Sequence, residues 1–234
     1  MSSDELTHYG VEGMRWGVRH DREGVHRTSI GSINIEPGFH SGTKKAAIEV
    51  SNLMRERYGY NIRNIKVLGP DMPEYPDTAA YVENNRKNNG LNEGTIFVQT
   101  RDLSKQLHEA EKVGWFGEGM GNTRGLLTHE SAHSMFHADE KVKGGIFTPE
   151  RIVGGNVKAR DKALRAALKV ARNDKVSIMD VSGYAQAAGV KQELEAEMFS
   201  QYHWSPNPPR FVQAWGQTLH KELGVDPTPF KEVK

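Results

Sequence analysis

Two histidines four residues apart, His129 and His133, constrain this chain of 234 residues more than any other feature. Residues four apart lie on one face of an α-helix, so a helix here would aim both imidazoles at one point. The surrounding segment favours a helix over residues 123–138, because apolar side chains recur at helical spacing and no proline interrupts it. An ordinary amphipathic helix that carries two histidines by chance is the alternative interpretation.

Between the histidines stands Glu130, which completes the pattern His-Glu-Ser-Ala-His. In the H-E-x-x-H pattern the two histidines bind zinc, and the glutamate takes a proton from a water on the metal. The chain contains no cysteine, so any metal must be held by histidine and carboxylate side chains. The segment therefore predicts a zinc site with His129 and His133 as ligands and Glu130 as general base.

A catalytic zinc site needs a third protein ligand and an open fourth position. His137 continues the spacing, but eight residues place it ~12 Å along the helix from His129, too far for one ion. We therefore expect His137 to lie beside the site or on the surface. The remaining candidates for the third ligand lie downstream: Asp180, Glu193, Glu195 and Glu197.

Among these candidates, Glu193 and Glu197 are four residues apart and would share one face of a helix. Glu195 would point roughly the other way, and we expect it to be solvated. A charged and exposed helix face is the alternative for the whole run.

The wider pattern predicts an α+β fold in one compact domain over residues 41–234, preceded by an irregular arm over residues 1–40. We expect a small mixed β-sheet packed against the helix of His129, followed by a mainly helical half. The expected strands cover residues 62–68, 79–82 and 95–99. The expected helices cover residues 43–58, 103–113, 123–138, 157–172, 192–202 and 208–223. The helix over 157–172 should carry a solvated cationic face.

Composition narrows the classes of partner. The chain has 31 Lys and Arg against 30 Asp and Glu, a net charge of +1, which argues against nucleic acid as a partner. No apolar run approaches the ~18 residues of a membrane span, and the first residues lack the features of a secretory signal. We expect a soluble protein in a cytoplasm, with no membrane partner.

Three blocks together carry a family resemblance: His129 to His133, the sequence Val-Ser-Gly-Tyr-Ala from Val181, and Glu-Leu-Glu-Ala-Glu-Met-Phe from Glu193. This combination resembles the anthrax-lethal-factor-like zinc peptidases, a gluzincin-type group that includes domains encoded in phage genomes. The resemblance covers about residues 60–215 and is specific only in the three blocks. It implies a zincin-like fold and the hydrolysis of peptide bonds.

The same resemblance implies a role for each matching residue. His129, His133 and Glu193 would hold zinc, and Glu197 would orient a ligand histidine. Tyr184 would donate a hydrogen bond to the oxyanion of the reaction, with Glu130 as general base. Two departures stand against the family pattern: Glu193 follows Tyr184 by nine positions, a longer spacing than the family pattern has, and Glu195 occupies a position that is usually apolar.

The sequence allows alternatives for the third ligand and for Tyr184. Asp180 or Glu197 could replace Glu193 as the third ligand, and Tyr184 could instead be a half-buried residue whose hydroxyl caps a loop. We expect the substrate, a protein or peptide, to add as a strand along residues 95–99. The glycine-rich loop over residues 114–125, with Trp115 and Phe116, would close over it.

The N-terminal segment over residues 6–19 resembles a short segment of virion-linked proteins of tailed bacteriophages. Its aromatic and apolar residues Tyr9, Met14 and Trp16 are typical of anchors that dock on a partner. The resemblance implies docking on a phage virion protein; alternatively, the segment folds back on the domain. The spacing of His8, His20 and His26 suggests no metal site, and we expect them at the surface.

Taken together, these patterns predict a zinc metalloendopeptidase of phage origin, located in the host cytoplasm, in the virion or in both. It would use a zinc-bound water and Glu130 as general base. A catalytically degenerate virion protein is one alternative, and a protease effector that a phage delivers against a host protein is another.

Overall fold

The structure, a computed structural model, describes residues 24–28, 31–67, 80–84, 93–99, 104–140 and 156–226. The docking segment over residues 6–19 lies outside this part of the chain, as do His8 and His20. The side chains of His26 and His137 also lie outside it.

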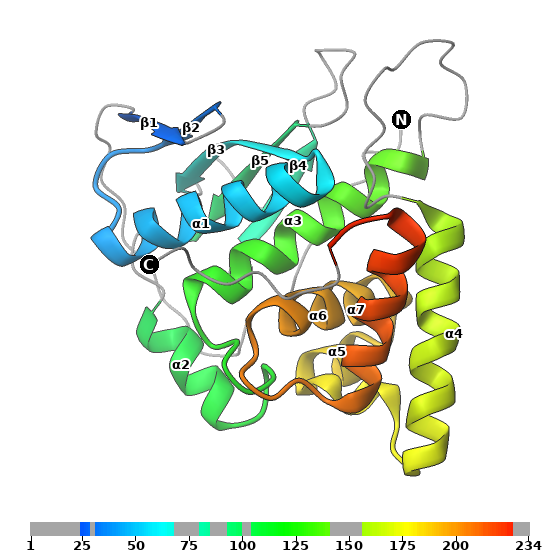
Figure 1. Cartoon of the computed structure of the whole chain (residues 1–234). Coiled ribbons are helices and arrows are strands. Elements are labelled where there is room, and N and C mark those ends of the chain that lie inside the picture. The colour runs from blue at the N-terminus through cyan, green and yellow to red at the C-terminus, as the bar shows by residue number, and fades with distance from the viewer. Residues whose placement is uncertain are drawn as a thin grey trace, which may run out of the picture.

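A five-stranded sheet forms one side of the molecule (Figure 1). Its strands are β1 (Gly24–Thr28), β2 (Gly31–Ile35), β3 (Asn61–Val67), β4 (Ala80–Asn84) and β5 (Glu93–Val98), in the order β1-β2-β3-β5-β4. The three middle strands are parallel, whereas β1 and β4 run antiparallel to their neighbours at the two edges. The sheet is mixed, as predicted.

The prediction of an irregular arm over residues 1–40 is wrong for the part that forms β1 and β2. Ile33 and Ile35 alternate with polar residues and bury their side chains in the core. Such a short alternation does not stand out in a sequence, and the partner that stabilises β2 is β3, about thirty residues downstream. The compact fold therefore includes residues before Ser41.

Two helices connect the sheet to the rest of the fold. Helix α1 (Ser41–Tyr58) begins at His40, whose Nδ1 accepts a hydrogen bond from the Gly42 N–H at 3.2 Å. It ends at Gly59, whose left-handed backbone (φ 65°) lets its N–H bond to carbonyls of the last turn. Helix α3 (Thr123–Glu140) packs against α1 and against strands β4 and β5. The sheet is thus packed against the helix that carries the two histidines.

The second half of the chain is mainly helical (Figure 1). It contains α4 (Val157–Asp174), the short 3-10 helix η3 (Ile178–Val181), α5 (Gly183–Ala188), α6 (Lys191–Trp204) and α7 (Arg210–Leu223); α2 (Ser104–Lys112) precedes α3. Every residue of α6 from Glu193 to Trp204 is buried, since α3, α5 and α7 pack around it. The predicted α+β fold is confirmed, and α6 is its central helix.

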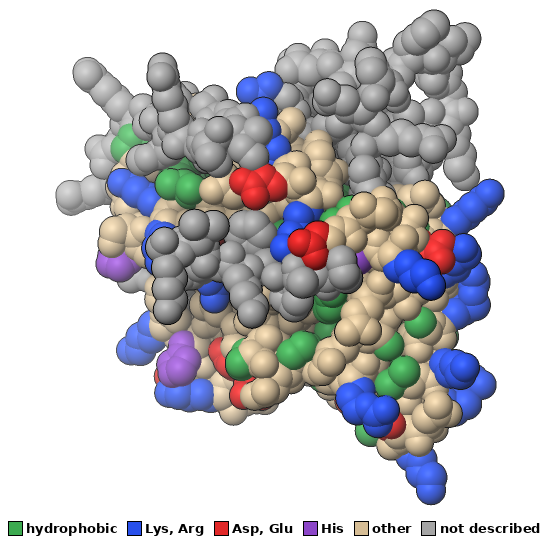
Figure 2. Space-filling view, viewed as in Figure 1, with side chains coloured by type: hydrophobic (Ala, Val, Ile, Leu, Met, Phe, Trp, Pro, Cys, Tyr) green, Lys and Arg blue, Asp and Glu red, His purple; other side chains and the backbone are tan. Residues whose placement is uncertain are grey.

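Helix α4 packs along α7 and faces solvent on its other side. Its alanines Ala159, Ala163, Ala167 and Ala171 are buried at helical spacing. Figure 2 shows Lys and Arg side chains over the side of the molecule that α4 forms. One basic residue, Arg160, is buried, which departs from the solvated cationic face expected for this helix. Among the described residues, no helix combines the length and apolar character that a membrane crossing requires.

Candidate metal centre

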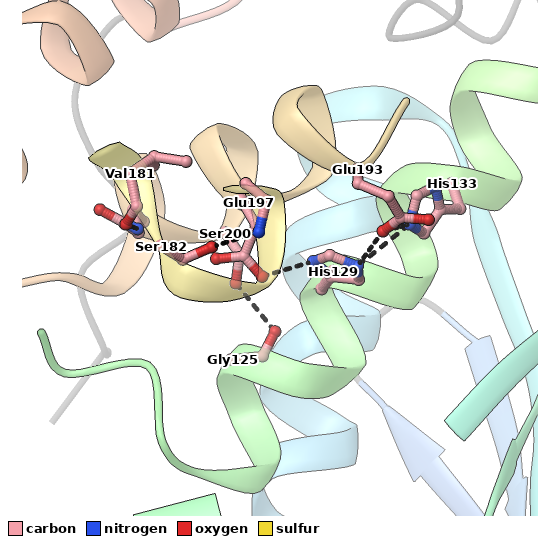
Figure 3. A network of polar contacts seen from close by, with 10 residues as sticks. Gly125, His129, His133, Val181, Ser182, Glu193, Glu197 and Ser200 are labelled. Carbon is pink, nitrogen blue, oxygen red and sulfur yellow. Dashed lines mark hydrogen bonds and ion pairs between the residues drawn. The ribbon is translucent and has the colours of Figure 1, made fainter. Parts of the chain in front are cut away.

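The side chains of His129 and His133 lie on the face of α3 that meets α6 (Figure 3). Both are buried, and their Nε2 atoms are 3.0 Å apart. The four-residue spacing alone accounts for this approach, because it stacks the two imidazoles on one helix face. Two facing Nε2 atoms can share at most one proton between neutral rings, so an acceptor pair of this kind suits a cation.

Glu193, in the first turn of α6, completes the cluster. Its Oε2 lies 3.2 Å from His129 Nε2 and 3.1 Å from His133 Nε2. The three atoms form a nearly equilateral triangle, and ligand atoms on a tetrahedral zinc with bonds of ~2.0 Å would be separated by about 3.3 Å. In the described part of the chain, this is the group of His and acidic residues whose ligand atoms converge. The structure thus shows a buried His-His-Glu cluster that could hold a metal ion.

Glu197 lies one turn further along α6 and contacts the His129 ring from the Nδ1 side (Figure 3). Its Oε1 is 3.1 Å from His129 Nδ1. A carboxylate there favours a proton on Nδ1 and leaves the Nε2 lone pair directed at the metal position. Glu197 therefore contacts His129 on the side away from the three converging atoms, and its role in orienting a ligand histidine stays a prediction. We call His129, His133, Glu193 and Glu197 together the metal cluster.

These carboxylates control the protonation of His129. Burial by itself lowers the pKa of this imidazole, but hydrogen bonds to Glu193 and Glu197 and their negative charges raise the pKa well above its usual value. The raised pKa means that a metal ion would compete with a proton for this imidazole.

Tyr184 borders the same cluster from α5. Its ring centroid is 5.8 Å from that of His129. Burial raises the pKa of this phenol far above its usual value, and the charges of Glu193, Glu130 and Glu197 and a hydrogen bond with Glu193 raise it further. The phenol therefore stays protonated and acts as a hydrogen-bond donor. Its hydrogen bond with Glu193 joins it to a carboxylate of the cluster.

The backbone around Tyr184 explains how the phenol reaches the cluster. The Gly183 N–H donates to the Gly114 carbonyl at 2.9 Å, and the Tyr184 N–H donates to the Trp115 carbonyl at 3.0 Å. The Trp115 ring lies 5.9 Å from the Tyr184 ring, centroid to centroid. Glu111 holds the far end of this loop, since its carboxylate accepts from the Gly121 N–H at 2.8 Å. The loop over residues 114–122 thus positions Tyr184, and its closure over a substrate stays a prediction.

Glu130 is buried, and the charge of its carboxylate helps to raise the pKa of the Tyr184 phenol. The structure therefore brings together His129, Glu130, His133, Tyr184, Glu193 and Glu197. The catalytic roles of Glu130 and Tyr184 stay predictions.

Two of the candidate acidic residues behave differently from expectation. Asp180 is exposed and caps η3, accepting a hydrogen bond from the Ser177 N–H at 3.0 Å, so it is not part of the cluster. Glu195 is buried, whereas we expected it in solvent. Helix α6 is covered on all sides, so the face opposite the metal cluster also meets a neighbouring helix.

The proposed substrate strand over residues 95–99 is also a wrong prediction. Strand β5 pairs with β3 on one side and with β4 on the other, so its backbone has no free edge for a peptide. The pattern of residues marks a strand but does not reveal its neighbours. The edge nearest α3 belongs to β4, which pairs with β5 and contacts α3 within the described residues.

Two further residues, missed in the sequence, join α6 to α3. Ser200 Oγ donates to the Gly125 carbonyl at 2.8 Å (Figure 3), and Trp204 Nε1 donates to Thr128 Oγ1 at 2.7 Å. With Glu193 and Glu197 they follow the spacing 193, 197, 200, 204, which is one helix face. That periodicity was the signal available, and it marks the surface of α6 that meets α3.

Comparison with known proteins adds information only at the N-terminus. A model of a family of unknown function, DUF7211, matches residues 1–23, which precede the described part of the chain. No curated protein matches the chain. No solved structure matches it either.

Proposed function

We propose that this chain is a zinc-dependent metalloendopeptidase, with His129, His133 and Glu193 as the zinc ligands. The observation that carries the proposal is the buried triangle of two imidazole nitrogens and one carboxylate oxygen, with sides of 3.0 to 3.2 Å. Three protein ligands of this type, with the fourth position open, are the donor set of catalytic zinc sites of the His₂Glu class.

Zinc, when bound, would polarise the carbonyl of the substrate and lower the pKa of a water toward ~7. Glu130 would take the proton of the attacking water and deliver it to the leaving amine. Tyr184 would donate its phenolic proton in a hydrogen bond to the carbonyl oxygen as negative charge develops there. Support for this role is its hydrogen bond to Glu193, which places the hydroxyl beside the ligand triangle.

The substrate class follows from the sheet edge. Among the described strands, β4 lies at the edge of the sheet and contacts α3, so an extended peptide pairing with β4 would run close to the helix of His129 and His133. This arrangement supports a protein or peptide substrate bound by its backbone, with β4 in place of the strand we first expected.

The N-terminal segment belongs to the proposal as a separate element. Residues 1–23 match a family model by themselves, which supports a unit that recurs apart from the rest of the chain. We infer that residues 6–19 dock on a partner, a phage virion protein in the most specific form of the proposal, and that the enzyme acts in the host cytoplasm or the virion. The complete ligand triangle argues against a degenerate domain, whereas a protease effector would use the same site.

Zinc content and turnover of the purified full chain test the proposal. We expect about one zinc per chain by elemental analysis and cleavage within a library of unstructured peptides, read by mass spectrometry. Glu130→Gln should keep the zinc and lower turnover by ~10²–10⁴-fold, because only proton transfer is removed. Glu56→Gln, the same change at an exposed glutamate of α1, is the matched control. A wild-type chain that takes up no zinc on incubation, or a fully active Glu130→Gln variant, contradicts the proposal.

A further inference from the structure

A buried ion pair lies on the side of α6 that faces away from the metal cluster. Arg160 Nη1, near the start of α4, is 2.9 Å from Glu195 Oε2, and the two side chains are only 5% and 1% exposed. The other carboxylate oxygen of Glu195 faces Lys191 Nζ at 3.8 Å. Glu195 itself stands between Glu193 and Glu197 in the sequence, so the pair involves the same turns of α6 as the metal cluster.

The same guanidinium also contacts α3. Arg160 Cζ lies over the ring of Phe136, 4.8 Å from its centroid. Phe136 follows His133 by three residues, which is less than one turn of helix. Arg160 therefore contacts the helix that carries both histidines and the helix that carries Glu193.

Helical geometry relates the ion pair to the ligand. Two residues correspond to a turn of about 200°, so Glu195 points to the opposite side of α6 from Glu193 and Glu197. The helix is thus held from two sides, by His129 and His133 on one and by Arg160 on the other. A carboxylate ~6 Å from the helix axis moves by about 1 Å for a rotation of about 10°, which exceeds the tolerance of a metal site.

Stability alone is a poor explanation for this pair. Removing two charges from water is costly, and an apolar pair of similar volume is often as stable or more stable. What an apolar pair lacks is the directional contact that fixes the rotation of one helix against its neighbour.

We propose that Arg160 and Glu195 are positioning residues that fix the rotation of α6, so that Glu193 and Glu197 meet His129 and His133 in ligand geometry. The proposal rests on the proposed metal centre. It assigns no contact with substrate to either residue.

The double variant Arg160→Met with Glu195→Leu tests it in the full chain. This apolar pair should keep the cooperative unfolding transition at an equal or higher Tm, because no charge is left unpaired. Its dissociation constant for zinc, from competition with a chelator, should rise ~10–100-fold. The visible absorption of the Co²⁺-substituted variant should also differ from wild type, since that spectrum reports the coordination geometry.

The matched control is the ion pair of Lys162 and Glu222, which joins α4 to α7 with Nζ and Oε2 2.5 Å apart. Lys162→Met with Glu222→Leu should leave zinc affinity and the Co²⁺ spectrum unchanged. If the Arg160 and Glu195 double variant unfolds, Glu195→Gln replaces it, with weaker zinc binding expected there too.

The outcomes separate the two proposals. A folded variant that binds zinc as tightly as wild type, with the same Co²⁺ spectrum, overturns the positioning role and leaves the metal centre standing. Wild-type protein that binds neither metal overturns both. Weakened binding in the double variant alone, with the control pair unaffected, supports the positioning role.

Discussion

Among the described residues, the protein buries two pairs of histidines, and different polar groups surround each pair. In the metal cluster of His129, His133, Glu193 and Glu197, two Nε2 atoms face each other and a carboxylate. In the second group, which we term the phenol cluster, His203 Nε2 and His220 Nε2 both face the Tyr58 hydroxyl, at 2.7 and 2.5 Å.

Protonation separates the two clusters. Carboxylates raise the pKa of His129 despite its burial. In the phenol cluster, burial lowers the pKa of His203 well below its usual value, and the nearby His220 and Arg57 add to the effect. Burial likewise lowers the pKa of His220 to about 4, with Arg57 adding to the shift and the backbone and charge of Asp226 opposing it.

The phenol cluster is therefore a neutral hydrogen-bonded joint. Burial holds the pKa of the Tyr58 phenol well above its usual value, so its hydroxyl donates to one imidazole and accepts from the Nε2–H of the other. The joint connects α1, α6 and α7. Two buried histidines alone do not make a metal site; the acidic residues, and the convergence of lone pairs, distinguish the metal cluster.

The largest expected effect comes from the same substitution in each cluster. His133→Asn should weaken zinc binding by about 10²–10³-fold, since the ~10–16 kcal/mol of zinc binding in four-ligand sites amounts to roughly 2.5–4 kcal/mol per ligand. Glu193→Ala should do the same. His203→Asn should leave zinc affinity unchanged. Chelator competition measures all three, and a variant of Glu193 that keeps full affinity would remove it from the ligand set.

The second effect is a lower free energy of unfolding in acid, caused by the phenol cluster. The unfolded chain binds more protons than the folded chain between the folded pKa of His220, about 4, and its unfolded pKa, about 6.5. The contribution of His220 is thus present above pH 6.5 and lost as the pH falls toward 4, at a cost of about 3 kcal/mol in the free energy of unfolding. Denaturant titrations of metal-free protein across this range measure it.

The metal cluster should show the opposite sign in the same experiment. The raised pKa of His129 contributes stability that is present below pH 6.5 and lost as the pH rises through its folded pKa.

Two variants test the assignment of the acid effect to His220. His220→Gln should flatten the acid limb of the plot of unfolding free energy against pH, whereas His108→Gln, at an exposed histidine, should not change it. An unchanged acid limb in His220→Gln would show that other groups cause the acid sensitivity.

The smallest expected effect tests the orienting carboxylate. Glu197→Gln keeps the size of the side chain but removes the charge that holds the proton on His129 Nδ1, so zinc binding should weaken ~10–100-fold. Tyr58→Phe is the counterpart in the phenol cluster, and it should lower the free energy of unfolding by ~1–3 kcal/mol without changing zinc affinity. Equal zinc affinity in Glu197→Gln and wild type would assign Glu197 a purely structural contact.

Much of the site could be predicted because its geometry is local. The four-residue spacing of His129 and His133, and of Glu193 and Glu197, places each pair on one helix face whatever surrounds it. The ends of helices are equally local, as Gly59 shows with its left-handed backbone at the end of α1. These features depend only on residues that are close together in the sequence.

Contacts between distant segments could not be derived in this way. Asp180 and Glu193 are both acidic residues downstream of the histidines, and only the packing of α6 on α3 brings Glu193 and not Asp180 to within 3.2 Å of His129. Strand β2 depends on β3 for its hydrogen bonds, and β5 becomes an interior strand because β4 pairs with its outer side.

By itself, then, the sequence determined which of the candidate site residues share a helix face. The tertiary structure decided which faces meet. It buried Glu195 against Arg160, where sequence reasoning placed it in solvent, because the burial of a charged residue depends on the helix packed opposite it. Periodicity is a property of neighbours along the chain, whereas the environment of a side chain is set by segments far from it in sequence.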